Sequence, residues 1–384
     1  MKSFETKWKN VKRSFVMFFS IIALLFLLEG CTKDSSPVSP ATNPAWYENV
    51  DSSISQIMVT SGSPGAIVGI FENDKPLAVF AKGYSNIASL TKMKDDMKFR
   101  IASNTKTFTA ITVQLLVEDN LIDLNKHLID YLPNCGIQYA ETITVRQLLN
   151  MTSGIASYNE QSQFVDVWNS NPLIPWTKEQ LLNIIQTSTP DFYPGTSWHY
   201  SDSNYFLLGL IIEAATNQSS ESEITNKILL PLSLNNTSFP VTPDMPDNYC
   251  SGYKLDQSNV LVESSRISPT GPWTGGAMIS NIYDLGKWVK VLGTGSLLSD
   301  NMKIQCFDWK TGPNGVFYGL GVMRVLGLRG HDGLIQGFET IMLYSPEKDA
   351  AVVVMLNKGN EDQHAQPAAS LCINIFRTVF PELF

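Results

Sequence analysis

Short apolar runs joined by polar turns mark both ends of the chain. Runs 66–71 and 76–81 flank a polar segment near the N-terminal end. Runs 338–344 and 350–356 flank a proline-containing turn near the C-terminal end. Each pair has the pattern of a β-hairpin. Because Val352-Val353-Val354 places three apolar residues in succession, its strand is predicted to be covered on both faces.

The long middle of the chain, roughly residues 105–290, combines helical patterns with loops that contain aromatic residues, proline and glycine. Apolar residues recur at helical spacing over 108–122 and 178–186, and again over 366–379. Strands at both ends around a helical middle predict one antiparallel β-sheet flanked by helices, with an inserted helical subdomain over roughly 126–264. We therefore expect an α/β fold with an additional all-α lobe.

The N-terminal segment has the pattern of an export signal. Basic residues precede an apolar run from Phe15 to Leu28, whose 14 residues fall short of the about 20 that a transmembrane helix needs. Residues 1–30 are therefore predicted to be a secretory signal peptide. The run ends in Leu28-Glu29-Gly30-Cys31, which resembles the lipobox of bacterial lipoproteins and implies lipidation of Cys31. The alternative is an uncleaved anchor with an incidental cysteine.

Residues 31–44 are rich in serine and proline, and we expect them to tether a membrane to a folded domain formed by residues 45–384. The expected location is the bacterial cell envelope, where the exported chain is held by its lipid. A net charge of −8 argues against a nucleic-acid partner, because such binding requires a basic surface.

The other four cysteines, Cys135, Cys250, Cys306 and Cys372, are widely spaced, and no CxxC motif or Cys/His cluster accompanies them. This spacing argues against a zinc site, and we expect neither a metal nor an organic cofactor. Two alternatives stay open for these residues. They are isolated buried thiols, or they form one or two disulfides in an oxidising envelope.

Ser103-Asn104-Thr105-Lys106 is the candidate centre for chemistry. The same SxxK spacing occurs at Ser89, Ser251 and Ser345, but only Ser103 opens a predicted apolar helix. Residues three apart lie on one helix face, so the Ser103 and Lys106 side chains can meet. The positive end of the helix dipole favours a developing alkoxide and disfavours a protonated lysine. A capping serine beside a surface lysine is the alternative.

Two later motifs support the catalytic interpretation. Tyr200-Ser201-Asp202 precedes an apolar helix start, and His331-Asp332-Gly333 leads into a terminal strand. In this order and spacing, the three motifs resemble those of the penicillin-recognising serine enzymes, and most closely the branch with class C β-lactamases, serine DD-carboxypeptidases and related esterases. The resemblance covers roughly residues 45–384 and implies a serine β-lactamase-like fold.

The resemblance also implies catalytic roles for three side chains. Ser103 is expected to be the nucleophile that becomes acylated, with Lys106 as its base or proton partner. Tyr200 is expected to pass a proton to the leaving group. Taken one at a time, Tyr200 and His331 would more commonly have structural roles. The order of the three motifs along the chain is what makes them candidate active-site residues.

The remaining motif implies how a substrate would be bound. His331 stands where many relatives have the lysine of a KTG motif. Gly333 is expected to keep the strand edge open for an extended substrate. The backbone N–H groups of Ser103 and Leu334 are expected to form the oxyanion hole.

Asp202 departs from the family pattern, which usually has asparagine at this position. An ionised aspartate can only accept hydrogen bonds, and by ion pairing it would hold Lys106 protonated. We hypothesise that this residue weakens recognition of acylamide substrates, including β-lactams. A degenerate SDN motif, Ser201-Asp202-Ser203, is an alternative alignment, but SDN belongs with a KTG element that this chain lacks.

The sequence therefore predicts a serine hydrolase that works through an acyl-enzyme. Its expected substrate is a D-amino-acid peptide, as for a DD-carboxypeptidase, or a small ester, and peptidoglycan fragments are candidate ligands. Two alternatives remain: a class C-type β-lactamase, and a catalytically weak homologue that binds cell-wall fragments.

Overall fold

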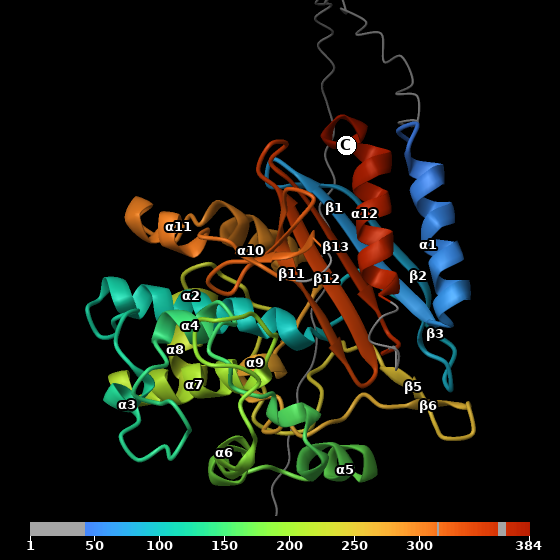
Figure 1. Ribbon diagram of the computed structural model, residues 1–384. Helices are drawn as coiled ribbons and strands as arrows, with labels where there is room; N and C mark the ends of the chain where they lie inside the picture. Colours follow the sequence, from blue (N-terminus) through green and yellow to red (C-terminus); the bar gives the residue numbers. More distant parts are fainter. Residues whose placement is uncertain (1–42, 313–314, 360–365) are drawn as a thin grey trace, which may run out of the picture. The chain divides into compact units, whose positions relative to one another are not determined.

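Strands from both ends of the chain form one sheet in the computed structural model, which describes residues 43–312, 315–359 and 366–384 (Figure 1). Its nine strands lie in the order β3-β2-β1-β13-β12-β11-β10-β9-β8, and every pairing is antiparallel. The bounds are β1 Gly65–Glu72, β2 Lys75–Asn86, β3 Thr91–Lys92, β8 Lys310–Thr311, β9 Phe317–Tyr318, β10 Met323–Val325, β11 Leu328–Ile335, β12 Phe338–Ser345 and β13 Ala350–Leu356. The two ends of the chain meet where β1 pairs with β13, so the prediction of one sheet completed by both ends is confirmed.

Both predicted hairpins are present. The β1–β2 turn consists of Asn73 and Asp74, whose φ angles are 49° and 65°. Positive φ at both central positions is typical of the type I′ turn, whose twist matches that of the flanking strands. Asparagine and aspartate reach this conformation more readily than other non-glycine residues. The second predicted hairpin corresponds to β12 and β13.

Helices cover both faces of the sheet. On one face, α12 (Pro367–Val379) lies against β12 and β13, and α1 (Tyr47–Ser61) lies against α12, β1 and β2 (Figure 1). On the other face, α10 (Ile282–Thr294) packs against β13. Val352 and Val354 join the apolar cluster under α1 and α12, whereas Val353 joins the cluster that includes α10. Since β13 is buried along its whole length, the predicted strand with two covered faces is confirmed.

The helical middle of the chain packs beside the sheet and holds most of the remaining helices. Its elements are β4 Phe99–Arg100, α2 Thr105–Glu118, α3 Leu128–Tyr131, α4 Val145–Leu149, α5 Ser162–Ser170, α6 Lys178–Thr187, α7 Asp202–Thr216, α8 Ser220–Ile224, a π-helix Thr225–Leu229, β5 Tyr253–Leu255, β6 Leu261–Glu263, α9 Trp273–Gly276, β7 Ile279–Ser280 and α11 Asp300–Cys306. The helices α2 and α9 lie outside the expected lobe bounds of 126–264 but pack against α7. The fold class is the expected one: an antiparallel sheet flanked by helices, with an added helical region.

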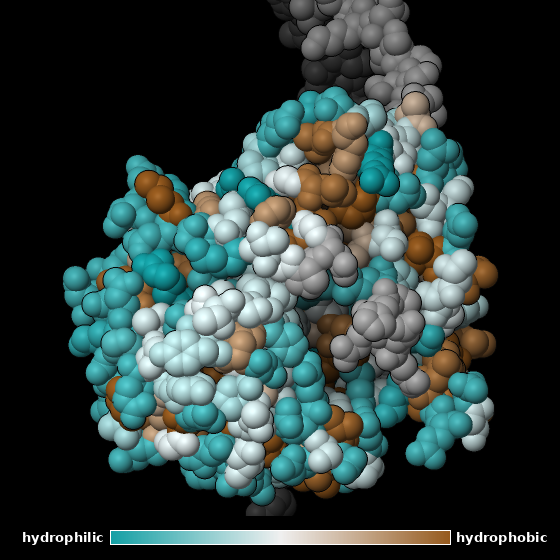
Figure 2. Space-filling model, viewed as in Figure 1, coloured by the Kyte–Doolittle hydropathy of each residue, from teal (hydrophilic) through white to brown (hydrophobic). Residues whose placement is uncertain are grey.

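Residues Ala45–Phe384 form one compact unit. The four cysteines within it are buried free thiols. On the face seen in Figure 2, hydrophilic residues predominate and apolar side chains form separate groups. None of the described helices is long and apolar enough to cross a membrane, and the described residues hold no cluster of metal-binding side chains. The predicted signal peptide, the lipidated Cys31 and nearly all of the predicted tether lie outside the described residues.

Candidate active site

Ser103 lies in a single turn of 3₁₀ helix, η1 (Ala102–Asn104), that runs directly into α2. The sequence placed Ser103 in the first turn of the α-helix, but this helix begins only at Thr105. Ala102 has a φ of +48°, a conformation that costs a non-glycine residue about 1–3 kcal/mol and recurs at functional sites. From Phe99 to Gln114 every residue is buried except Ser103, which is partly exposed. Ser103 is therefore the one residue of this segment that is appreciably exposed to solvent.

Gly333 on β11 makes room for the η1 turn. A Cβ atom at this position would lie 2.4 Å from the carbonyl oxygen of Ile101 and 3.0 Å from the Cβ of Ala102. Thr340, which is opposite Gly333 on β12, accepts a hydrogen bond of 2.8 Å from the Asn104 side chain. From the sequence, Gly333 was expected to keep the strand edge open for a substrate. In the structure, its lack of a side chain also lets the η1 turn approach β11.

One edge of β11 has no strand partner beyond Gly330 among the described residues, because β10 pairs only with Leu328–Gly330. The β11–β12 hairpin closes on the pair Ile335–Phe338 with two residues between them. In such a two-residue hairpin the closing pair is hydrogen-bonded, and the pairs that follow are alternately non-hydrogen-bonded and hydrogen-bonded. Leu334 and Glu339 therefore form a non-hydrogen-bonded pair. The N–H and C=O groups of Leu334 therefore point away from β12, toward the unpaired edge. An extended ligand could add to the sheet at this edge.

Lys106 is fully buried, and its ammonium group meets three acceptors. Its Nζ donates to Ser103 Oγ at 3.0 Å and to the carbonyl oxygen of Gly275 on α9 at 2.8 Å. The third acceptor is Asp202 Oδ1, with which Lys106 forms a close ion pair. Three acceptors match the three N–H bonds of a protonated lysine. The site therefore holds the Lys106 amine between the Ser103 hydroxyl and a carboxylate.

Asp202 is the first residue of α7, where the helix dipole favours a negative charge. Its Oδ2 accepts a hydrogen bond of 2.6 Å from Asn159 Nδ2, and its backbone N–H donates to Ser157 Oγ at 2.8 Å. The Ser157 hydroxyl in turn donates to Asn159 Oδ1 at 2.6 Å, which fixes the orientation of the amide. Sequence reasoning missed Ser157 and Asn159, because no spacing rule connects them to a residue more than 40 positions away.

Tyr200 completes the cluster around Ser103. The Lys106 Nζ lies 5.0 Å from the centre of its ring. Burial raises the pKa of Tyr200 well above its usual value of 10, and the charges of Asp202 and Asp332 act in the same direction, whereas a hydrogen bond with Ser103 opposes them. Because its pKa is raised, the phenol keeps its proton at neutral pH. Tyr200 can therefore donate a proton and is a poor base.

His331 is fully buried, and both of its ring nitrogens have partners. Nδ1 lies 2.6 Å from the carbonyl oxygen of Asp332, and Nε2 lies 3.0 Å from the Tyr318 hydroxyl. Burial lowers the pKa of His331, while Asp332 opposes this shift, so the neutral ring is favoured. The neutral ring then donates from Nδ1 and accepts the Tyr318 proton at Nε2. The substrate contact expected of His331 stays a prediction; in this structure the centre of its ring lies 6.1 Å from that of the Tyr200 ring.

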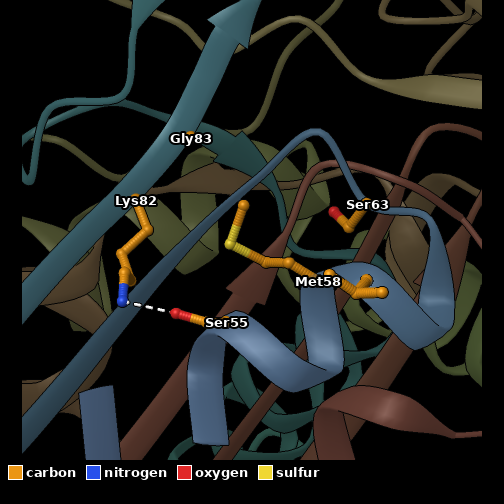
Figure 3. A pocket seen from close by; sticks show the side chains of 6 residues that line it. Ser55, Met58, Ser63, Lys82 and Gly83 are labelled. Atoms are coloured by element: carbon orange, nitrogen blue, oxygen red, sulfur yellow. Dashed lines mark hydrogen bonds between the residues drawn. The ribbon is translucent and has the colours of Figure 1, made fainter. Parts of the chain in front are cut away.

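A separate pocket lies between α1 and β2 (Figure 3). It is lined in part by Ser55, Met58 and Lys82. The Lys82 ammonium group donates to Ser55 Oγ at 2.7 Å and pairs with Asp51 at 2.7 Å. No side chain of the Ser103 cluster lines this pocket, so it is distinct from the candidate active site.

The fold thus brings Ser103, Lys106, Tyr200 and Asp202 into one cluster, from two segments far apart in the sequence. The His331 ring is a neighbour of the Tyr200 ring, and Leu334 lies on β11, the strand that contacts the η1 turn. Of the residues that the sequence analysis did not single out, Gly275 and Asn159 contact the cluster directly. A pair of glycines after a tryptophan was the only sequence signal near Gly275.

Known proteins resemble this chain in both sequence and fold. Protein flp of Staphylococcus aureus (strain N315) is 28% identical over 323 residues, which cover 82% of this chain and 64% of that protein. The matched region thus spans less than two thirds of the relative's length. Penicillin-binding protein 4* of Bacillus subtilis (strain 168) is 27% identical over 304 residues, which cover 74% of this chain and 66% of that protein.

Two solved structures share the fold over most of the chain. A D-stereospecific amidohydrolase from Streptomyces sp. superposes with a TM-score of 0.76 and 27% identity, covering 86% of this chain and 98% of that one. D-amino acid amidase from Ochrobactrum anthropi SV3 superposes with a TM-score of 0.76 at 24% identity, covering 87% of this chain and 99% of that one. The family model described as Beta-lactamase matches residues 50–372. The chain therefore belongs to the β-lactamase family and has the fold of that family.

Proposed function

We propose that this enzyme hydrolyses a D-amino-acid peptide or a small ester through an acyl-enzyme formed on Ser103. The observation that carries the proposal is the Ser103–Lys106 contact. A partly exposed serine, alone in a buried segment, lies 3.0 Å from the ammonium group of a fully buried lysine. Nucleophile and base in hydrogen-bond reach, with the base held by a third group, is the arrangement that covalent catalysis requires. Here the third group is Asp202.

The proposed reaction has two steps. In acylation, Ser103 Oγ bonds to the substrate carbonyl carbon and its proton passes to Lys106, which must first be in the neutral form. The bond to the leaving group then breaks, and the leaving group takes a proton from Tyr200, which Lys106 afterwards replaces. In deacylation, water attacks the ester, releases the acid and restores the Ser103 hydroxyl. Tyr200 keeps its proton at neutral pH and therefore has a proton to give.

The unpaired edge of β11 supports an extended substrate. A substrate backbone along this edge would pair with Leu334 and bring its carbonyl group toward the η1 turn. The N–H groups of Ser103 and Leu334 would then bind the oxyanion, and removal of one such donor costs comparable enzymes about 3–4 kcal/mol of transition-state stabilisation. His331 acts through Tyr200 in this proposal and is a positioning residue.

The names of the relatives support the substrate class. One solved neighbour at 27% identity is a D-stereospecific amidohydrolase, and one relative at 27% identity is a penicillin-binding protein. We further propose that the enzyme is exported and held in the bacterial cell envelope by a lipid on Cys31, on the basis of the N-terminal sequence pattern. Loss of the protein from the membrane fraction in a Cys31→Ser variant is the expected result.

Covalent labelling tests the proposed function. A fluorophosphonate and a fluorescent penicillin are applied to the wild type, to Ser103→Ala and to Ser89→Ala. Ser89 is a matched control, because it has the same SxxK spacing but lies on the exposed surface. We expect the fluorophosphonate to label the wild type and the control but not Ser103→Ala. Equal labelling of all three proteins, or of none, would contradict the proposal.

One observation favours the alternative of a catalytically weak binding homologue. All three N–H bonds of Lys106 have acceptors, so the resting lysine has no free lone pair for the Ser103 proton. The same experiment separates the two functions. Absence of labelling, together with tight binding of muropeptides, would support the binding homologue. Efficient hydrolysis of the penicillin by the wild type would instead support the class C-type β-lactamase.

A further inference from the structure

The charged groups around Ser103 are mostly negative. The charges that act on Tyr200 are those of Asp202 and Asp332, and Lys106 is the one cation that acts on the neighbouring His331. Burial raises the pKa of the Glu160 carboxyl group, and the charges of Asp191 and Asp202 act in the same direction, against the influence of His199. The field at the centre therefore favours a cationic ligand and disfavours a carboxylate.

Asp202 is accessible to a ligand, unlike the lysine beside it. The Asp202 side chain is 17% exposed, whereas the Lys106 side chain is 0% exposed. Each carboxylate oxygen can accept two hydrogen bonds, and each oxygen of Asp202 has one side-chain donor, Lys106 on Oδ1 and Asn159 on Oδ2. The carboxylate therefore has capacity for a further N–H donor from the solvent side.

The position of Asp202 is fixed by the fold. The loop before Asn159 is joined to the first turn of α7, where Tyr158 N–H donates to Ser203 Oγ at 2.9 Å and Ser203 Oγ donates to the carbonyl oxygen of Ala156 at 2.7 Å. With the Ser157 and Asn159 contacts already described, the carboxylate is held from both sides. A receptor held in this way loses little conformational entropy when a ligand binds.

Ser103 and Asp202 lie close together, because both accept a hydrogen bond from Lys106 Nζ. In an amino acid the α-nitrogen lies about 2.5 Å from the carbonyl carbon. When Ser103 Oγ attacks that carbon, the α-nitrogen is within reach of a carboxylate that shares Lys106 with the nucleophile. We infer that Asp202 is the receptor for a protonated α-amino group, so that the preferred substrates are esters, amides or peptides whose reacting D-amino acid has a free amine. This inference rests on the proposed function and names its substrate class.

An acylated amine does not suit this receptor. Its nitrogen carries no charge, and the carbonyl oxygen of its acyl group needs a donor, which an ionised Asp202 cannot supply. The inference therefore separates this enzyme from hydrolases that act on N-acyl peptides and β-lactams.

Matched substrates test the inference. We compare D-alanine p-nitroanilide with its N-acetyl derivative, which has the same leaving group, on the wild type, Asp202→Asn and Asp191→Asn. The control Asp191→Asn removes the same charge from a residue that pairs with His199 and does not contact Lys106. Because both substrates depend equally on the chemical step, the ratio of their kcat/KM values isolates recognition of the amine.

We expect the wild type and Asp191→Asn to prefer the free amine at least about 10-fold, the lower end for hydrogen bonds to charged groups, and Asp202→Asn to lose this preference. The wild-type kcat/KM for the free amine should also fall as the pH rises through about 8, where an α-amino group loses its proton, without a matching fall for the N-acetyl substrate. Equal or reversed preference in the wild type, or an unchanged ratio in Asp202→Asn, would overturn the inference.

A competition assay tests the inference even if the enzyme turns over both anilides too slowly to measure. It also distinguishes failure of the Asp202 inference from failure of the proposed function. If neither anilide is cleaved, D-alaninamide and N-acetyl-D-alaninamide are tested for protection of Ser103 from the fluorophosphonate. Protection by the free amine only supports the inference, and equal protection or none overturns it while the proposed function stands. A Ser103 that the fluorophosphonate never labels contradicts the proposed function itself, and with it the inference.

Discussion

Glu339 links the stability of the sheet to pH, and the variant Glu339→Gln measures this link. Glu339 lies on β12 opposite Leu334, and only 5% of it is exposed. Its Oε1 accepts a hydrogen bond of 2.9 Å from the N–H of Ala368 at the start of α12, and Oε2 has no partner among the described residues. Burial raises the pKa of Glu339 from 4.5 to about 7, with Asp332 acting in the same direction and the Ala368 hydrogen bond and Lys358 opposing.

The sign and size of the effect follow from this shift. A carboxyl group whose pKa is higher in the folded than in the unfolded state binds its proton more tightly when folded. Its contribution to stability is therefore fully present below about pH 4.5 and is lost as the pH rises through about 7. At about 1.4 kcal/mol per pH unit, the loss over this interval is about 3 kcal/mol. Glutamine keeps the hydrogen bond from Ala368 and cannot ionise.

Urea unfolding of the wild type and Glu339→Gln at several pH values between 4.5 and 8.5 provides the assay. We expect nearly equal free energies of unfolding at the acid end, and a glutamine variant that is more stable by about 3 kcal/mol at pH 8. The control is Glu347→Gln, which makes the same substitution at an exposed residue on the β12–β13 turn. A difference between wild type and Glu339→Gln that stays constant from pH 4.5 to 8.5 would refute the reasoning.

Three substitutions at the site give further tests. Tyr200→Phe removes the phenolic proton and should lower kcat about 10²–10⁴-fold in steady-state kinetics with little change in Tm; a kcat within a few-fold of wild type would exclude Tyr200 as the proton donor. Gly333→Ala places a Cβ 2.4 Å from the Ile101 oxygen, so we expect a loss of about 1–3 kcal/mol in urea unfolding and slower labelling of Ser103, and an unchanged stability would contradict this packing. Asn159→Ala frees one oxygen of Asp202 and should raise KM for a free-amine substrate several-fold at constant Tm, whereas an unchanged KM would show that this hydrogen bond does not orient the carboxylate.

Local patterns in the sequence were sufficient for the main elements of the fold. The alternation and length of the apolar runs predicted β1, β2, β12 and β13, because side chains on a strand alternate between two faces. The triple valine predicted a strand with two covered faces for the same reason. The short strands β8 to β10 escaped prediction, because segments of two or three residues show no measurable period. Yet the end of β10 is what leaves the rest of this β11 edge without a strand partner among the described residues.

The sequence alone also supplied the residue types of the site and their order along the chain, since Ser103 and Lys106 are close in sequence and their contact is local. What only the tertiary structure decided is which distant groups surround them. The carbonyl group of Gly275, the amide of Asn159 and the burial of His331 depend on how segments far apart in the sequence pack together. Hydrophobic periodicity constrains the partners of one element but not the contacts among several, because the same apolar face can pack in many ways until the whole core forms.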